Sequence, residues 1–300
     1  MCGIVGLFLK SDRLERELGR HLSAMLVEMT DRGPDSAGIA LYGRPLGAAD
    51  AKLTLYHRRR DHDWPALGAE LGAALGARIA IDAKGNAAVV TLPATQLDPA
   101  RAWLKRHKPD VFVTSWGAAV EIYKDMGLPK DVVDRYRLGA AHGTHGIGHT
   151  RMATESAVTT EHSHPFAAAA DICLVHNGSL SNHNRLRRWL ERHGQSFESD
   201  NDTEVAARYF AFRLNEGATL KEAFEAGLKD LDGFYTFAIG TRDGFAVMRD
   251  SFACKPAVMA ETDDWVAMGS EFRALAALPG IADASIWEPA PEIVYSWTRS

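Results

Sequence analysis

The 300-residue sequence is poor in cysteine, with only Cys2, Cys173 and Cys254, and these lie far apart. No CxxC pair is present, so the sequence predicts neither a disulfide framework nor a thiolate metal site. Each cysteine therefore has to be interpreted singly.

The sequence also lacks an excess of basic charge and long apolar runs. Its formal net charge is −5, which argues against nucleic acid and anionic membrane surfaces as partners. No run of about 18 apolar residues could span a bilayer, and the first residues do not form a secretory signal. We therefore expect a cytoplasmic protein that binds neither membrane nor nucleic acid. Neither a GxGxxG nor a GxxxxGK[ST] motif is present, so no nucleotide-binding motif is identified.

Hydrophobic residues make up 46% of the chain, enough for a large core. The opening segment CGIVGLFLK and the later AGIALYG, which ends at Gly43, are short and apolar, as is typical of buried strands. Between them, leucine and methionine recur through 13–31 at a spacing that predicts an amphipathic helix.

The middle of the chain has weaker patterns. We predict helices at 64–77, 99–107 and 118–126 and a strand at 87–92. We interpret about 44–138 as a long insertion or subdomain within a single domain that covers 1–300.

After Gly139 the patterns sharpen again. A strand at 172–176 is followed by Asn177-Gly178, a pair that favours a tight turn. Helices are predicted at 182–193, 203–215 and 220–228, followed by strands at 234–241, 244–249, 257–261 and 265–270. This order predicts an α+β fold of stacked layers.

Cys2 admits two interpretations. It is a small residue at the start of a core strand, or, once Met1 is removed, an N-terminal nucleophile. In the second case its α-amino group, which titrates near pH 7.7 to 8 in model compounds, accepts the thiol proton. No separate catalytic histidine is then needed.

Three further features suit acyl transfer from a free amino acid. Asn177-Gly178 offers a side-chain amide and a glycine N–H for a developing oxyanion, and a tight turn is compatible with that role. Arg151 suits an α-carboxylate and Asp202 an α-ammonium group. Their alternatives are a surface charge for Arg151 and a helix N-cap for Asp202.

Taken together, these motifs resemble those of the class II glutamine amidotransferases. The resemblance rests on Cys2, segment 32–38 (RGPDSAG), segment 148–151 (GHTR), segment 176–178 (HNG) and segment 202–204 (DTE), in this order. It covers 1 to about 43 and 139 to about 260. It implies a four-layer α-β-β-α N-terminal-nucleophile hydrolase sandwich, interrupted by the insertion.

The resemblance also implies residue roles. Cys2 would attack the glutamine amide, and Asn177 and Gly178 would hold the oxyanion. Arg151 and Thr154 would bind the α-carboxylate, and Asp202 the α-ammonium. Arg32 would orient Cys2, and His164 would support the site or simply be a structural loop residue. Met152 and Glu155 depart from the aromatic residue and histidine usual in the sugar-phosphate and purine branches, which puts loop closure in doubt.

We expect no metal and no cofactor. The histidines of 142–164 have no accompanying carboxylate or cysteine at metal-ligand spacing.

Segments 254–258 (CKPAV) and 154–157 (TESA) look most like the amidotransferase subunits of glutamate-synthase-like proteins, including the N-methylglutamate synthase type. The expected function is therefore a glutaminase subunit that acts on glutamine and delivers ammonia or the glutamyl group to such synthase subunits. The alternatives are an independent amidohydrolase or acylase, and a catalytically idle scaffold subunit. Oligomeric state is left open.

Overall fold

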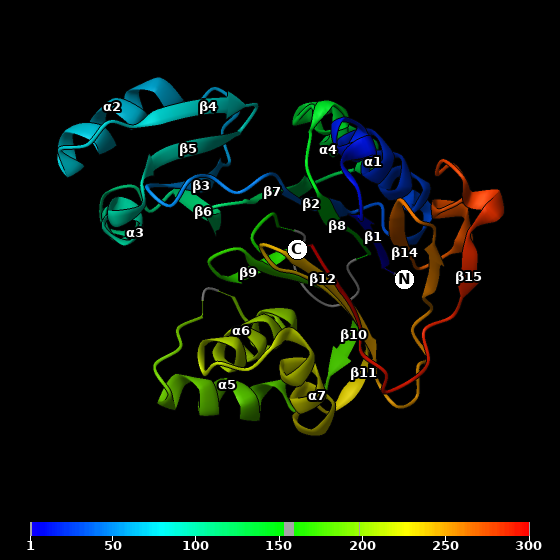
Figure 1. Ribbon diagram of the computed structural model, residues 1–300. Coiled ribbons are helices and arrows are strands. Elements are labelled where there is room, and N and C mark those ends of the chain that lie inside the picture. Colours follow the sequence, from blue (N-terminus) through cyan, green and yellow to red (C-terminus); the bar gives the residue numbers. More distant parts are fainter. Residues whose placement is uncertain (1, 153–158, 198, 300) are drawn as a thin grey trace.

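The computed structural model describes residues 2–152, 159–197 and 199–299. Its described strands form three sheets, and every pairing between them is antiparallel. Two sheets face each other and the third stands apart, at the upper left of Figure 1. None of the helices in the described part of the chain has the length and apolar composition needed to cross a bilayer.

The larger sheet has seven strands around the chain start. In spatial order they are β15 (Ser285–Trp287), β13 (Val258–Glu261), β14 (Trp265–Gly269), β1 (Gly3–Leu9), β8 (His145–Arg151), β2 (Ser36–Tyr42) and β7 (Val120–Met126). Helices α1 (Leu18–Glu28) and α4 (Pro129–Arg135) pack on its outer face through one apolar cluster that includes Leu22, Ile39 and Trp265.

The second sheet has five strands in the order β16 (Tyr295–Thr298), β12 (Gly244–Arg249), β11 (Gly233–Gly240), β10 (Ile172–Leu180) and β9 (Phe166–Ala169). Its outer face carries α5 (His183–Arg192), α6 (Asp202–Asn215) and α7 (Leu220–Asp230). A third cluster joins the inner faces of the two sheets, with Ile4 and Ala40 from one sheet against Val175 and Val247 from the other. The predicted four-layer α-β-β-α fold is thus confirmed, and strands such as β1 and β12 are buried along their whole length because they are covered on both faces.

Residues 50–117 form a small sheet with two helices. The sheet order is β4 (Ala80–Lys84), β5 (Ala87–Pro93), β3 (Asp50–His57) and β6 (Val111–Gly117), and α2 (Trp64–Leu75) and α3 (Leu97–His107) share its apolar cluster. We call this unit the insertion. The helix predicted at 118–126 was wrong, because this segment is β7, paired residue by residue with β2. The chain thus returns from the insertion directly into the large sheet.

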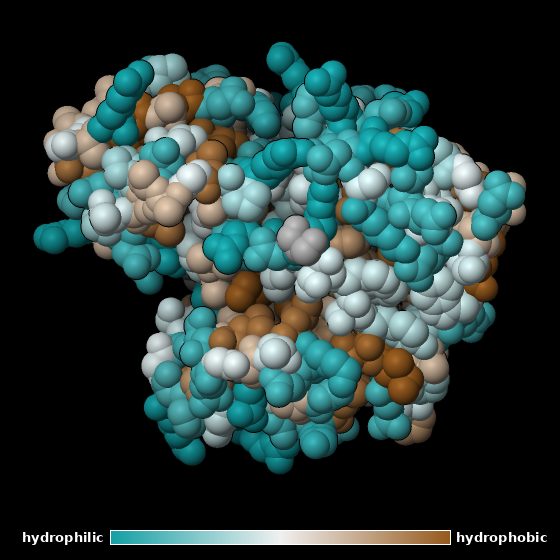
Figure 2. Space-filling view, viewed as in Figure 1, coloured by the Kyte–Doolittle hydropathy of each residue, from teal (hydrophilic) through white to brown (hydrophobic). Residues whose placement is uncertain are grey.

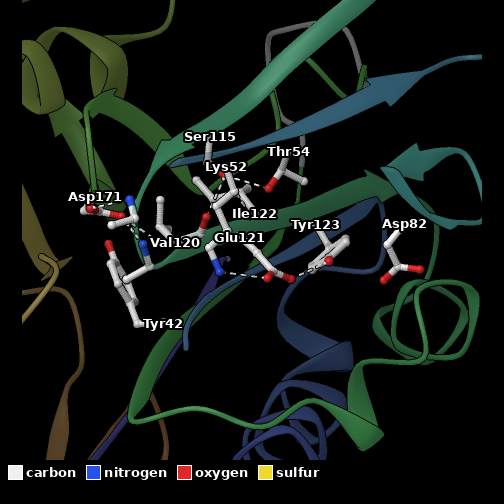
Figure 3. A network of polar contacts seen from close by, with 12 residues as sticks. Tyr42, Lys52, Thr54, Asp82, Ser115, Val120, Glu121, Ile122, Tyr123 and Asp171 are labelled. Atoms are coloured by element: carbon white, nitrogen blue, oxygen red, sulfur yellow. Dashed lines mark hydrogen bonds and ion pairs between the residues drawn. The ribbon is translucent and has the colours of Figure 1, made fainter. Parts of the chain in front are cut away.

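Polar contacts attach the insertion, and the turn between β6 and β7 that follows it, to the sandwich (Figure 3). The carboxylate of Asp171, in the turn between β9 and β10, accepts backbone N–H groups of Ala118, Ala119 and Val120 at 2.7–3.0 Å. The ammonium group of Lys52 on β3 lies 2.9 Å from a carboxylate oxygen of Glu121 on β7. These groups are largely buried, so the β6–β7 hairpin is fixed against both neighbouring sheets.

Candidate active site

Cys2 immediately precedes β1 and is partly exposed. Gly3 follows it and pairs with Thr150 on β8. A Cβ atom at position 3 would lie 2.8 Å from the Thr150 hydroxyl oxygen and 2.9 Å from the Met29 Cβ, so only glycine fits here. The cysteine thiol is therefore held at the end of a buried strand, with its Sγ 3.9 Å from the carbonyl oxygen of Met152.

The structure places Arg32 directly against Cys2. Its Nε donates a 2.9 Å hydrogen bond to the Cys2 carbonyl oxygen, and its Nη1 donates to Glu271 at 2.8 Å. The guanidinium group is buried, and it holds the pKa of the Glu271 carboxyl below its usual range. This fixed ion pair, with one end on Cys2, can orient the residue that carries the candidate nucleophile.

Asn177 approaches Cys2 from the other sheet. Its Nδ2 donates to the Cys2 carbonyl oxygen at 3.0 Å and lies 3.2 Å from the Ser270 hydroxyl oxygen. The predicted tight turn at Asn177-Gly178 was wrong, since both residues lie inside β10 and pair with Thr236 and Tyr235 of β11. Gly178 does have a positive φ of 140°, and a Cβ there would lie 1.7 Å from the Phe234 carbonyl oxygen.

His149 fixes the orientation of the Asn177 side chain. Its Nε2 lies 3.1 Å from the backbone oxygen of His176 and 3.2 Å from Oδ1 of Asn177. Because a backbone oxygen can only accept, Nε2 must carry the proton, and the Asn177 oxygen is then the second acceptor. The Asn177 amide N–H₂ is consequently turned towards Cys2. Burial lowers the pKa of His149 to about 3, so the ring is neutral near pH 7.

Two more buried histidines lie behind Asn177. His164 Nε2 and His176 Nδ1 both contact the hydroxyl oxygen of Thr203, at 2.8 and 3.0 Å. The His164 and His149 rings meet edge to face with centroids 4.0 Å apart. Burial lowers the pKa of both His164 and His176. Sequence reasoning missed this cluster, although each histidine stands in or beside a segment that it had singled out.

The cluster does not have the arrangement of a metal centre. Within the described ranges, no group of three or more histidine, cysteine, aspartate or glutamate side chains is placed to hold a metal ion.

The two predicted substrate-binding charges flank this region. Arg151 ends β8, beside the Gly3–Thr150 pair, and is buried. Asp202 begins α6, and its Oδ2 accepts the backbone N–H of Leu180 at 2.9 Å, two residues after Gly178. The N-cap of α6 is Asn201, whose side chain accepts from the Thr203 N–H at 2.8 Å, so Asp202 is not the cap. Thr154 and Glu155 lie outside the described residues.

The arrangement brings a cysteine, an oriented amide, a buried guanidinium and a carboxylate to one end of the facing sheets. Comparison with known proteins identifies the class. A family model for the glutamine amidotransferase domain matches residues 149–277. The glutamine amidotransferase-like protein GlxB of Rhizobium meliloti (strain 1021) is 56% identical over 298 residues, which is 99% of this chain and 98% of that protein.

More distant relatives agree. The amidophosphoribosyltransferase of Methanocaldococcus jannaschii is 34% identical over 168 residues, 55% of this chain and 36% of that protein. The solved glutamine phosphoribosylpyrophosphate amidotransferase from B. subtilis is 20% identical with a TM-score of 0.59, and the match covers all of this chain and 49% of that one, which shows a shared fold. The chain belongs to the class II glutamine amidotransferase family.

Proposed function

We propose that this chain is a glutaminase subunit in which Cys2, after removal of Met1, is the nucleophile. The observation that carries the proposal is the hydrogen bond from the Asn177 amide to Cys2, with the amide orientation set by His149. This geometry supports an oxyanion site of two donors, the Asn177 Nδ2–H and the Gly178 N–H, next to the thiol.

The proposed reaction has two halves. The α-amino group of Cys2 takes the thiol proton, and Sγ attacks the side-chain amide carbon of glutamine. The tetrahedral oxyanion collapses, the α-ammonium group returns the proton to the leaving nitrogen, and ammonia departs from a glutamyl thioester. Water then attacks the thioester and releases glutamate and the free thiol. Arg151 and Thr154 would hold the glutamine α-carboxylate, and Asp202 would hold its α-ammonium.

The proposal is tested by ammonia release from L-glutamine and from analogues. Cys2→Ala should abolish turnover, whereas Cys254→Ser should retain it, because Cys254 is exposed and has no role in the proposed reaction. N-acetylglutamine should lose at least about 30-fold in kcat/KM, the factor for losing about 2 kcal/mol when one partner of a buried charge pair is removed. Equal turnover of both substrates would instead indicate an independent amidohydrolase or acylase. No turnover by the wild type, alone or with its synthase, would indicate a scaffold subunit.

We further propose that the ammonia or glutamyl acceptor is a glutamate-synthase-like subunit, with the N-methylglutamate synthase type as the narrower candidate. Segment 254–258, which supports this assignment, lies beside the site. The Thr236 hydroxyl on β11 donates to the Lys255 carbonyl oxygen at 3.0 Å, and Thr236 pairs with Asn177. Affinity purification of the tagged chain from its native host should recover such a subunit. Repeated recovery of the chain without one would contradict this assignment.

A further inference from the structure

A cavity of about 720 Å³ lies between the insertion and the helical layer, and the proposed reaction does not use it. Its walls come from β6 and α3 of the insertion, from β9 and α6 of the sandwich, and from residues of the loops before β9 and α6. Figure 2 shows the molecule hollowed at the left of this view, between these two parts. The volume is in the range of cavities that bind small molecules.

The walls combine aromatic rings with cations. Five aromatic side chains line the cavity: Tyr56, Phe112, Trp116, Phe166 and Phe197. The guanidinium group of Arg101 lies 3.9 Å from the Trp116 ring centroid, and the Lys124 ammonium lies 4.6 Å from that of Phe166. These contacts place positive charge directly beside aromatic surface, so a flat anionic molecule could pack against both.

The charge balance of the walls favours an anion. Four lining side chains are basic (Arg101, Lys105, Lys124 and Arg208) and three are acidic (Asp98, Glu161 and Glu204). Each carboxylate already has hydrogen-bond donors: Asp98 from Arg101, Glu161 from Arg58, and Glu204 from the Ser199 backbone and hydroxyl. The three lining carboxylates therefore oppose an incoming anion less than their formal charge suggests, and the basic side chains outnumber them by one.

Arg208 adds an unused donor. Its Nη1 donates to the Ala168 carbonyl oxygen at 2.9 Å, and its Nη2 lies 3.6 Å from Glu204. Its Nε is buried and has no hydrogen-bond partner in the described part of the chain. A buried N–H without an acceptor is costly, and turning the Arg208 side chain towards a ligand oxygen in the cavity would remove that cost.

We propose that this cavity is a second binding site, for a small planar ring compound that carries a negatively charged group. Its rings stack on the aromatic walls, and its anionic oxygens bind Arg208 and the cations near it.

The position of the cavity links it to the proposed glutamine site. The Thr160 hydroxyl, on its wall, donates to Asp125 on β7 at 2.8 Å and lies 3.0 Å from the Tyr56 hydroxyl of the insertion. Glu161 is held by Arg58 at 2.7 Å. On the opposite wall, Glu204 lies two residues after Asp202. Arg151 precedes the wall formed by Thr160 and Glu161 in the sequence, and Asp202 lies next to the wall that contains Glu204. A ligand in the cavity should therefore change the apparent affinity for glutamine. This consequence rests on the proposed glutaminase function.

Binding is tested on the full chain with 8-anilinonaphthalene-1-sulfonate, a fluorescent ring compound with one negative charge. Ala102 is exposed on α3 and lines the cavity, so Ala102→Trp should fill the opening and weaken binding at least about tenfold by steric exclusion. The matched control is Ala69→Trp, the same change at an exposed position of α2 outside the cavity, which should bind as the wild type does. Equal binding by all three proteins would overturn the proposal.

The charge requirement is tested with the uncharged analogue N-phenyl-1-naphthylamine. It should bind the wild type at least about tenfold more weakly than the sulfonate does, because a guanidinium–anion contact contributes more than a neutral one. In Arg208→Gln the affinities for the two probes should lie closer together. Equal binding of the two probes would overturn the assignment to anions.

The link to the glutamine site is tested separately, by measuring the KM for glutamine with the sulfonate at saturation. We expect a change of at least about threefold in the wild type and none in Ala102→Trp, as reciprocal coupling requires. An unchanged KM in an active enzyme would overturn the link. A chain without glutaminase activity would contradict the proposed function, and the two binding measurements would still decide the cavity assignment.

Discussion

Asn177 is the residue at which the contacts of the candidate site converge. It is bonded on one side to Cys2 and on the other to His149, whose tautomer is set by a backbone oxygen. A carboxamide can rotate by 180° at little cost in shape, so without His149 its oxygen could face the nucleophile and repel the oxyanion. His149 is therefore a positioning residue in this account.

We predict that His149→Ala lowers kcat for glutamine about fivefold and leaves KM within about twofold, because one neutral hydrogen bond contributes about 1 kcal/mol and acts mainly on the transition state. His149→Gln, which can still donate to Asn177, should recover part of the loss. Steady-state kinetics of both variants, with circular dichroism as a control for folding, make the measurement. A KM effect without a kcat effect would contradict the positioning role.

At the scale of elements, the sequence predicted the helices and strands that have a clear local pattern of residues. It missed those whose conformation depends on pairing with distant strands. Helix α3, α5–α7 and strands β11 to β14 were found close to their observed bounds. Segment 118–126 was predicted to be a helix, although its residues 120–126 form β7. Pairing with β2 and burial of Val120 and Ile122 favour the strand.

The Asn177-Gly178 pair illustrates the same limit within the candidate site. Gly178 has the positive φ that an Asn-Gly pair favours, but β11 continues past the pair and holds it in a strand. Cys2, Arg32, Asn177 and Asp202 could be nominated from motifs, whereas the His149 and Thr203 contacts required the relative placement of β8, β10 and α6. Such placement arises from long-range packing, which a single sequence does not display.

Asp171 is predicted to hold the β6–β7 hairpin in place. Asp171→Ala removes the acceptor of three backbone N–H groups, and we expect a loss of about 2 to 4 kcal/mol in the free energy of unfolding, since hydrogen bonds to a charged group are the stronger kind. Asp171→Asn keeps one acceptor oxygen and tolerates the positive φ of 55°, so its loss should be smaller. Urea denaturation measures both, with the exposed Asp263→Ala as the control. Equal stability of Asp171→Ala and wild type would refute this anchoring role.

At the scale of the whole molecule, buried neutral histidines join the two sheets. His145, His149, His164 and His176 are all buried, and burial lowers the pKa of each, to about 4 for His145 and about 3 for His149. His149 and His145 lie on β8, and both bond to groups on or next to the opposite sheet. The sandwich therefore depends on these rings remaining uncharged.

The free energy of unfolding should consequently decrease as the pH is lowered. The pKa values of these histidines are lower in the folded protein than in the unfolded chain, so the unfolded chain binds protons first as the pH falls. The stabilisation is therefore complete above about pH 6.5 and declines below it. Each such histidine contributes a slope of up to about 1.4 kcal/mol per pH unit between that point and its own folded-state pKa. Urea unfolding at pH 7, 6 and 5 measures the slope, and His149→Gln should remove one histidine's share. Identical stability at pH 7 and pH 5 would contradict this interpretation.

The central claim is that Cys2 is a processed N-terminal nucleophile in a glutamine site. Its most direct test is intact-protein mass spectrometry before and after incubation with 6-diazo-5-oxo-norleucine, an electrophilic glutamine mimic, followed by peptide mapping. We expect that Met1 is absent, that one adduct forms, and that it maps to Cys2 rather than to the exposed Cys254. Retention of Met1, or an unlabelled Cys2 in the presence of the synthase partner, would contradict it.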